Sequence, residues 1–237
     1  MINITIYNEY IHELQNEKVG EIYPEGIHGA IKNLLSEDKN LNIRTATLKD
    51  INESLSNEVL ADTDVLFWWG HVAHDKVPED RVEAVYQRVL AGMGLVVLHS
   101  GHYSLPFRRL MATCCRSKWR EDGDRERIWV VEHSHPIANG IPEYFDIPHE
   151  ETYGERFDIP KPDDVVFISN FSGGEVFRSG CTFTRGMGKI FYFRPGHEEF
   201  PVYHMEVIGR ILRNAANWCY TENKVAPTFG HYPKIEG

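Results

Sequence analysis

The hydrophobic positions of this chain follow two alternating periods, which predict strands and helices in turn. Two segments carry apolar residues at helical spacing, one beginning near Pro24 and the other at Pro78. A succession of strands and helices of this kind predicts a parallel sheet with helices on both faces. The segments whose apolar residues alternate or run continuously, as is typical of strands, are 2–7, 41–47, 64–69 and 94–98.

The second half of the chain is less regular, but turn signals still separate strand-like segments. Ser179-Gly180 and Gly186-Met187-Gly188 predict turns between the last three of these segments. We expect a closing helix over 203–220 and an irregular arm over 221–237. Since no linker-like stretch divides the chain, residues 1–237 are expected to form a single domain. The expected strands are 127–132, 164–168, 175–178, 181–185 and 189–193.

The charge balance and the short motifs exclude several classes of function. Among 237 residues, 25 are basic and 35 are acidic, which gives a formal net charge of −10. No basic run follows the pattern of a phosphate-binding surface, so nucleic acid and anionic membranes are poor partners. The sequence shows no signal peptide, no long apolar run and no disulfide spacing among its four cysteines. We therefore expect a cytoplasmic protein with reduced cysteines. The absence of a P-loop and of a dinucleotide fingerprint predicts no nucleotide cofactor.

Two His-x-x-His pairs lie where apolar strands are expected to end. His71 and His74 follow the strand at 64–69, and His99 and His102 follow the strand at 94–98. In open α/β sheets, ligands bind beyond the carboxyl ends of the strands, so these pairs predict a site. Imidazole suits such a place because its pKa of about 6.5 allows it to act as base, acid or metal ligand.

A cluster of glutamates supplies the carboxylates that acid–base chemistry needs. Glu150, Glu151 and Glu155 lie within six residues of one another, in a segment expected to be a loop. Neighbouring carboxylates raise one another's pKa, which suits a general acid or base near neutral pH. The alternative is a solvated acidic loop. We select Glu151 and Glu155 for function and expect Glu150 to be exposed.

Several phrases of the sequence together resemble one known family. They are Trp68-Trp-Gly-His71, Gly92-Met-Gly-Leu-Val-Val-Leu-His99-Ser-Gly-His102, Lys118-Trp-Arg-Glu121, His135-Pro-Ile, Glu151-Thr-Tyr-Gly-Glu155, Gly173-Gly-Glu-Val-Phe-Arg-Ser-Gly180 and Arg194-Pro-Gly-His-Glu198. The family that these phrases resemble is the ThuA-like trehalose-utilisation family, whose members take part in disaccharide catabolism through keto-sugar intermediates. The resemblance implies a flavodoxin-like three-layer α/β sandwich with a mostly parallel sheet, similar to class I glutamine amidotransferases, and a small-molecule sugar as partner.

The similarity to amidotransferases can be followed at the turn that carries their nucleophile. Those enzymes have Gly-x-Cys-x-Gly at a sharp strand-to-helix turn, whereas this chain has Val97-Leu98-His99-Ser100-Gly101. A thioester mechanism needs a thiolate there, so we expect no glutaminase activity. The same relatives have a His-Pro-Glu near the end of the chain, in which the glutamate orients a catalytic histidine, and this chain keeps the His-x-Glu spacing with His197 and Glu199.

These observations assign roles to individual residues. The expected catalytic groups are His99, His197, Glu151, Glu155 and Glu199. We expect His99, His197 and either Glu151 or Glu155 to meet in one cleft at the carboxyl edge of the sheet. The expected substrate-binding residues are Trp69 as an aromatic surface for sugar, His71, Glu175, Arg178 and Arg194.

The same residues leave the cofactor and the class of function open. Zinc or another divalent metal could take three ligands and leave one position free, although such histidine pairs also occur without a metal. The candidate ligands are His71, either His99 or His102, and a carboxylate such as Glu151. The chain could be a sugar-processing enzyme, a non-catalytic carbohydrate-binding or sensor protein, or a metallohydrolase that does not act on sugars. Whether it forms a homo-oligomer is also open. His12 and His231 lie outside any motif and are expected to take no part.

Overall fold

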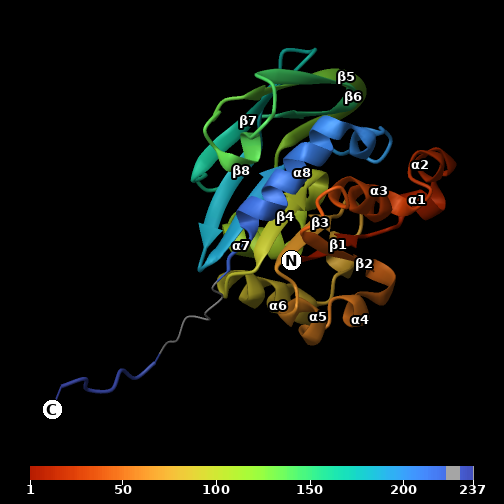
Figure 1. Cartoon of the computed structure of the whole chain (residues 1–237). Coiled ribbons are helices and arrows are strands. Elements are labelled where there is room, and N and C mark those ends of the chain that lie inside the picture. The colour runs from red at the N-terminus through yellow and green to blue at the C-terminus, as the bar shows by residue number, and fades with distance from the viewer. Residues whose placement is uncertain (223–229, 237) are drawn as a thin grey trace.

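A computed structural model describes residues 1–222 and 230–236 of the chain. Within these residues, the strands form one nine-stranded sheet in the order β2-β1-β3-β4-β9-β8-β7-β5-β6 (Figure 1). One half of the sheet is parallel, as the first half of the sequence predicts. Its strands are β2 (Leu41–Thr47), β1 (Ile2–Asn8), β3 (Val65–Trp69), β4 (Gly94–Leu98) and β9 (Gly188–Phe193).

The other half of the sheet is antiparallel, so the sheet is mixed and the expectation of a mostly parallel sheet is not confirmed. Antiparallel neighbours need only a short turn, whereas parallel strands need a long crossover. Such turns occur at Gly174 and Gly186, which have φ values of +94° and +57° that favour glycine. The remaining strands are β8 (Val176–Arg185), β7 (Asp164–Phe171), β5 (Lys118–Val130) and β6 (Tyr144–Gly154).

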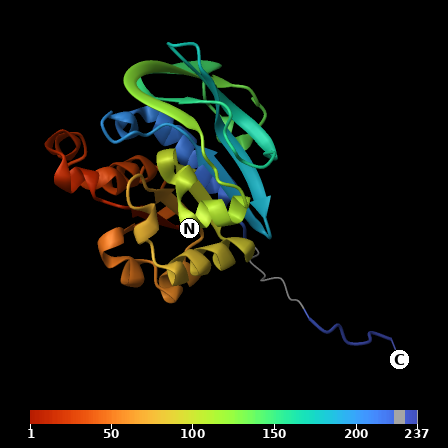
Figure 2. The ribbon, with the colours of Figure 1, turned by 180° about the vertical axis from the view of Figure 1, so that it is seen from behind.

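Helices cover both faces of the parallel half of the sheet, which gives the expected three layers there, while β5 to β8 extend beyond the helices (Figure 1). Alternate residues of the parallel strands enter two separate hydrophobic clusters, one on each face. Helices α3 and α8 bury their apolar sides in the first cluster, and α6 and α7 bury theirs in the second. Figure 2, seen from behind, shows this second face. The helices are α1 (His12–Gln15), α2 (Glu17–Ile22), α3 (Gly26–Leu35), α4 (Ile51–Ser54), α5 (Asn57–Ala61), α6 (Glu79–Leu90), α7 (Leu105–Met111) and α8 (Glu206–Cys219).

Three sequence-based expectations in the second half are wrong. The turn expected at Ser179-Gly180 lies inside the continuous strand β8. A Cβ atom at Gly180 would come within 2.4 Å of the Phe167 ring, so the glycine makes room for a neighbouring side chain and does not form a turn. The glutamate segment expected to be a loop is strand β6, and Glu150 is buried rather than exposed.

The C-terminal arm is described only in part. Residues 221–222 and 230–236 contain no helix or strand, while 223–229 and 237 of the expected arm lie outside the described residues. No helix in the described part of the chain is long and apolar enough to cross a membrane.

The parallel half of the sheet brings several segments of the chain to one edge. His71 follows β3, His99 follows β4, and the segment from Arg194 to His197 follows β9. Glu9 and His12 follow β1 at the same edge. Polar residues from distant parts of the sequence therefore meet beyond the carboxyl ends of the strands.

Candidate active site

The centre of the site is a sharp turn between β4 and a short 3-10 helix, η3 (His99–Tyr103). His99 is fully buried and has a φ of +50°, which non-glycine residues seldom adopt. Two residues later, a Cβ atom at Gly101 would come within 3.0 Å of the Trp68 carbonyl oxygen, so the turn needs glycine there. Strained positions of this kind cluster at functional sites.

The hydrogen bonds of His99 determine which ring nitrogen carries its proton. His99 Nδ1 lies 3.0 Å from the Arg194 carbonyl oxygen, which can only accept a hydrogen bond, so Nδ1 is the donor. In the neutral ring, Nε2 therefore has a free lone pair. This atom lies 3.2 Å from Glu151 Oε2, and both atoms are buried without a hydrogen-bond partner among the described residues. Two acceptors at this distance repel each other unless a proton or a cation lies between them.

The electrostatics of the pair favour a neutral His99. Burial lowers the pKa of His99 well below its usual value, and the nearby His71 lowers it further. Burial raises the pKa of Glu151, although His197 acts in the opposite direction. In the absence of a cation, the shared proton therefore belongs to the Glu151 carboxyl group.

Two further histidines complete a triangle of imidazole rings around this pair. The ring centroids of His71 and His99 are 5.6 Å apart, those of His71 and His197 5.5 Å, and those of His99 and His197 5.4 Å. Each of the three rings and Glu151 offers one ligand atom, and these four atoms lie within 4.8 Å of one another. Burial, followed by the effect of His99, lowers the pKa of His197 to about 4, so His197 is neutral at pH 7, as a metal ligand must be.

Two residues that sequence analysis did not select, Glu198 and His12, contact the Nδ1 side of the His71 ring. Its Nδ1 atom lies 3.2 Å from Glu198 Oε1, which also lies 3.2 Å from His12 Nδ1. Burial lowers the pKa of His71, but the Glu198 carboxylate outweighs this effect and holds it above the usual value. A carboxylate that accepts a hydrogen bond from one ring nitrogen fixes the tautomer of an imidazole. Because Glu198 lies at Nδ1 of His71, the Nε2 atom is free to act as a ligand.

A buried ion cluster fixes the positions of the segments that carry His99 and His197. Arg194, Glu126 and Glu150 are fully buried, and the Arg194 guanidinium is ion-paired with both carboxylates. Glu150 also accepts hydrogen bonds from the backbone N–H groups of Gly196 and His197, at 2.8 and 3.2 Å. The cluster thereby holds the segment that carries His197, and Arg194 supplies the carbonyl oxygen that orients His99.

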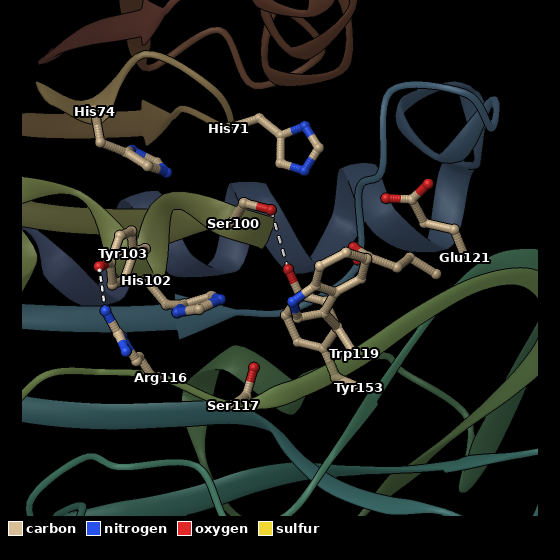
Figure 3. A pocket seen from close by; sticks show the side chains of 11 residues that line it. His71, His74, Ser100, His102, Tyr103, Arg116, Ser117, Trp119, Glu121 and Tyr153 are labelled. Carbon is tan, nitrogen blue, oxygen red and sulfur yellow. Dashed lines mark hydrogen bonds between the residues drawn. The ribbon is translucent and has the colours of Figure 1, made fainter. Parts of the chain in front are cut away.

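A cavity of about 460 Å³ lies against this centre (Figure 3). Glu151 and His71 line it, together with Ser100 of the turn and Tyr153, whose hydroxyl oxygen lies 3.0 Å from Ser100 Oγ. Trp119 also lines the cavity, and 64% of its side chain is exposed. A small molecule in this space would therefore contact Glu151 and an exposed indole at the same time.

Comparison with known families identifies the lineage of the chain. The model of the ThuA family, described as trehalose utilisation, matches residues 3–219. The chain belongs to this family. A comparison with curated proteins gave no match.

Solved structures agree with the ThuA fold. A ThuA-like protein from Parabacteroides merdae is 17% identical, with a TM-score of 0.68 over 97% of this chain and 92% of its own. A protein of Salmonella typhimurium described as cytoplasmic is 12% identical, with a TM-score of 0.63 over 93% and 100% of the two chains. A glutamine amidotransferase from Thermotoga maritima is 13% identical, with a TM-score of 0.56 over 92% and 97%. The amidotransferase-like fold is thus established for this member of the ThuA family.

Some of the site residues expected from the ThuA-like sequence meet in space, and others do not. His71, His99, His197 and Glu151 converge. His102 lines the cavity, but its Nδ1 atom is 2.6 Å from the Cys115 carbonyl oxygen and it lies outside the convergent set.

The expected carboxylates Glu155 and Glu199 lie away from the convergent set. Glu155 forms an ion pair with Arg178 at 2.8 Å, and although burial raises its pKa, this pair lowers it overall. Glu199 is ion-paired at 2.8 Å with Lys18, and only its backbone N–H contacts the His197 ring. The residue next to it, Glu198, is the carboxylate that faces the histidines.

The expected sugar-binding residues have structural contacts instead. Trp69 is fully buried and donates a hydrogen bond to the Gly196 carbonyl oxygen, so its face is not available to a ligand. Arg194 is equally buried in the ion cluster. Arg178 and Glu175 are held by Glu155 and Arg120 respectively, outside the cavity that Glu151 lines.

Proposed function

We propose that this protein processes a keto-type sugar derived from trehalose or a related disaccharide, in the cytoplasm, with His99 and Glu151 at the reaction centre. The family supports a role in trehalose utilisation. The observation that carries the reaction chemistry is the contact of 3.2 Å between His99 Nε2 and Glu151 Oε2, two buried acceptors with no hydrogen-bond partner in the described part of the chain.

The pair can move a proton at the wall of the cavity. Because its pKa is raised by burial, the Glu151 carboxyl can give a proton to a sugar oxygen and recover it near neutral pH. The Nε2 lone pair of His99 accepts the proton of Glu151 or one from a sugar hydroxyl, while its Nδ1–H stays bonded to the Arg194 carbonyl oxygen. A keto sugar suits such chemistry, because a proton on the carbon next to its carbonyl group can be removed by a base.

The same atoms also fit a divalent cation. Glu151, His99 and the neutral His197 could hold such a cation, and His71 could complete a set of three imidazoles and one carboxylate once it gives up its proton, because Glu198 holds its pKa above the usual value. These four protein ligands would fill a tetrahedral zinc site, so only a divalent metal that accepts a fifth ligand could also polarise a sugar carbonyl or activate a bound water. Glu198 would hold His71 in position, as carboxylates do behind metal-bound histidines.

Metal analysis and turnover of keto-disaccharides test the proposal. We expect about one transition metal per chain in untagged protein purified without chelator, and much less in His99→Ala. Both His99→Ala and Glu151→Gln should lower turnover by at least ~10²-fold. The control is His231→Ala, an exposed histidine, which should behave as wild type.

The other outcomes separate the parts of the proposal. Full turnover with no bound metal and no effect of chelator would exclude the metal and leave proton transfer by His99 and Glu151. Sugar binding without turnover of any keto-disaccharide would favour a carbohydrate-binding or sensor protein. A protein that neither binds sugars nor turns them over would contradict the proposed function as a whole.

A further inference from the structure

Trp119 is exposed although it is one of the largest side chains of the protein. Its exposed fraction is 64%, whereas Trp68 and Trp69 are buried. Among the described residues no aromatic ring or cation packs against it, in contrast to Trp129 of the same strand, whose ring centroid is 4.9 Å from that of Tyr144. An indole buries a large apolar area when it finds a partner, so an unpartnered indole in a cavity wall indicates a ligand surface.

The position of Trp119 relates it directly to the reaction centre. Trp119 on β5 pairs with Tyr153 on β6, and the Tyr153 hydroxyl contacts Ser100 in the turn that begins with His99. Both side chains face the cavity that Glu151 and His71 line (Figure 3). A ring lying on the indole would therefore have the Glu151 carboxyl within the same cavity.

The groups around the indole match the two kinds of surface on a pyranose ring. Ser117, Glu121 and Arg116 line the same cavity and offer hydroxyl, carboxylate and guanidinium groups. A pyranose presents C–H groups on its faces and hydroxyls at its edge, so the indole fits a face and these polar groups fit the edge. The cavity of about 460 Å³ is within the range of small-ligand sites, about 300–1,000 Å³.

We propose that Trp119 is the stacking platform for a pyranose ring of the substrate, and that it holds the ring with its reacting carbon toward Glu151 and His99. This inference rests on the proposed function, because it takes the ligand to be a sugar. The sequence suggests Trp69 as the aromatic surface for sugar, whereas this inference assigns that role to Trp119.

Calorimetric titration of the full chain with trehalose and its keto derivative tests the platform. We expect Trp119→Ala to weaken sugar binding about tenfold, the size of a lost aromatic contact, with Trp119→Phe in between. The melting temperature should not change because the indole is exposed. Trp129→Ala is the matched control, since Trp129 is a partly exposed indole of the same strand outside the cavity, and it should bind sugar as wild type does. Sorbitol, a polyol without a ring, should not bind.

Glu151→Gln separates this inference from the proposed reaction. If Glu151→Gln loses turnover and retains sugar binding that depends on Trp119, both ideas stand. If wild type binds sugar through Trp119 without any turnover, the platform stands and the proposed reaction fails. Sugar affinity that is equal in Trp119→Ala and wild type would refute the platform, and so would a lack of sugar binding by wild type. The platform would also be wrong if Trp119→Ala dissociated a dimer in light scattering and left sugar affinity unchanged.

Discussion

Replacement of Arg194 by methionine should strongly destabilise the protein, because Arg194 neutralises two carboxylates that water cannot reach. Arg194, Glu126 and Glu150 all have an exposed fraction of 0%. Methionine keeps much of the side-chain volume but removes the charge and the hydrogen-bond donors. Glu126 and Glu150 would then face each other in the interior without a cation, and each would have to take up a proton or lose its burial.

The expected loss follows from the burial of the cluster. Removing one partner of a buried ion pair costs about 3–5 kcal/mol of the free energy of unfolding. In a chain of this size, each kcal/mol lowers the melting temperature by about 2–4 °C, so Arg194→Met should lower it by about 6–20 °C. The matched control is Arg127→Met. Arg127 also binds a carboxylate, through two hydrogen bonds of 2.8 Å to Asp146, but their exposed fractions are 32% and 36%. Such a surface pair contributes about 0–1 kcal/mol.

Urea denaturation followed by circular dichroism measures both variants under the same conditions. The midpoint of Arg194→Met should fall well below that of Arg127→Met, with the slope of the transition unchanged. The reasoning would be refuted if Arg194→Met lay within about 1 kcal/mol of wild type. A stable Arg194→Met that had lost sugar affinity would instead support the substrate-binding role that the sequence suggests for Arg194.

Other predictions concern single groups around the site. Burial lowers the pKa of His102 to about 3, so below about pH 6.5 the unfolded chain binds a proton that the folded chain does not, and the free energy of unfolding falls as the pH is lowered. His102→Asn, which retains an N–H donor, should reduce this dependence by up to about 1.4 kcal/mol per pH unit between about pH 6 and 4. Urea titrations that give wild type and His102→Asn the same pH dependence would contradict this. Glu198→Gln should weaken metal binding about 10–100-fold, whereas Glu199→Gln, in an exposed pair, should bind metal normally; competition with a chelating dye distinguishes the two. Glutamine should release no ammonia, because the turn carries His99 in place of a thiolate; ammonia release that survived His99→Ala would disprove this alignment of the turn.

The parallel half of the fold could be predicted from sequence because its signals are local. A strand buried on both faces is a continuous apolar run, as at 65–69, and it alternates with helices of a different period. The strand 41–47 has the predicted bounds, and the helix expected from Pro78 is α6. The same rule places His71 and His99 at the carboxyl ends of neighbouring strands, where they meet.

In the antiparallel half, the expected strands 127–132, 164–168 and 181–185 overlap β5, β7 and β8, but β6 was missed because several of its buried positions are polar. In β6, Glu150 and Glu151 have exposed fractions of 0% and 3%, so the hydrophobic alternation that marks a strand is absent. What permits the burial of Glu150 is Arg194, which comes from a segment 44 residues later in the chain. A local pattern contains no information about so distant a cation.

Of the two site residues that were missed, His12 could have been found from the sequence, whereas Glu198 could not. His12 follows β1, whose carboxyl end lies at the same sheet edge as those of β3 and β4. Applying the strand-end rule to the first strand as well as to the later ones would have selected it. Glu198 required a choice between adjacent glutamates, and only the backbone direction after β9 decides that Glu198 faces the histidines and Glu199 faces Lys18.

The strand character of β6 also explains how two adjacent glutamates obtain different tasks. Successive side chains of a strand point to opposite faces, so Glu150 and Glu151 cannot face the same group. Glu150 accepts the backbone N–H groups of Gly196 and His197, while Glu151 meets His99 at 3.2 Å. A slip of one residue in the register of β6 would exchange the two carboxylates, releasing the segment that carries His197 and removing the partner of His99. The register of this strand, more than the number of acidic residues in it, therefore determines whether the site exists.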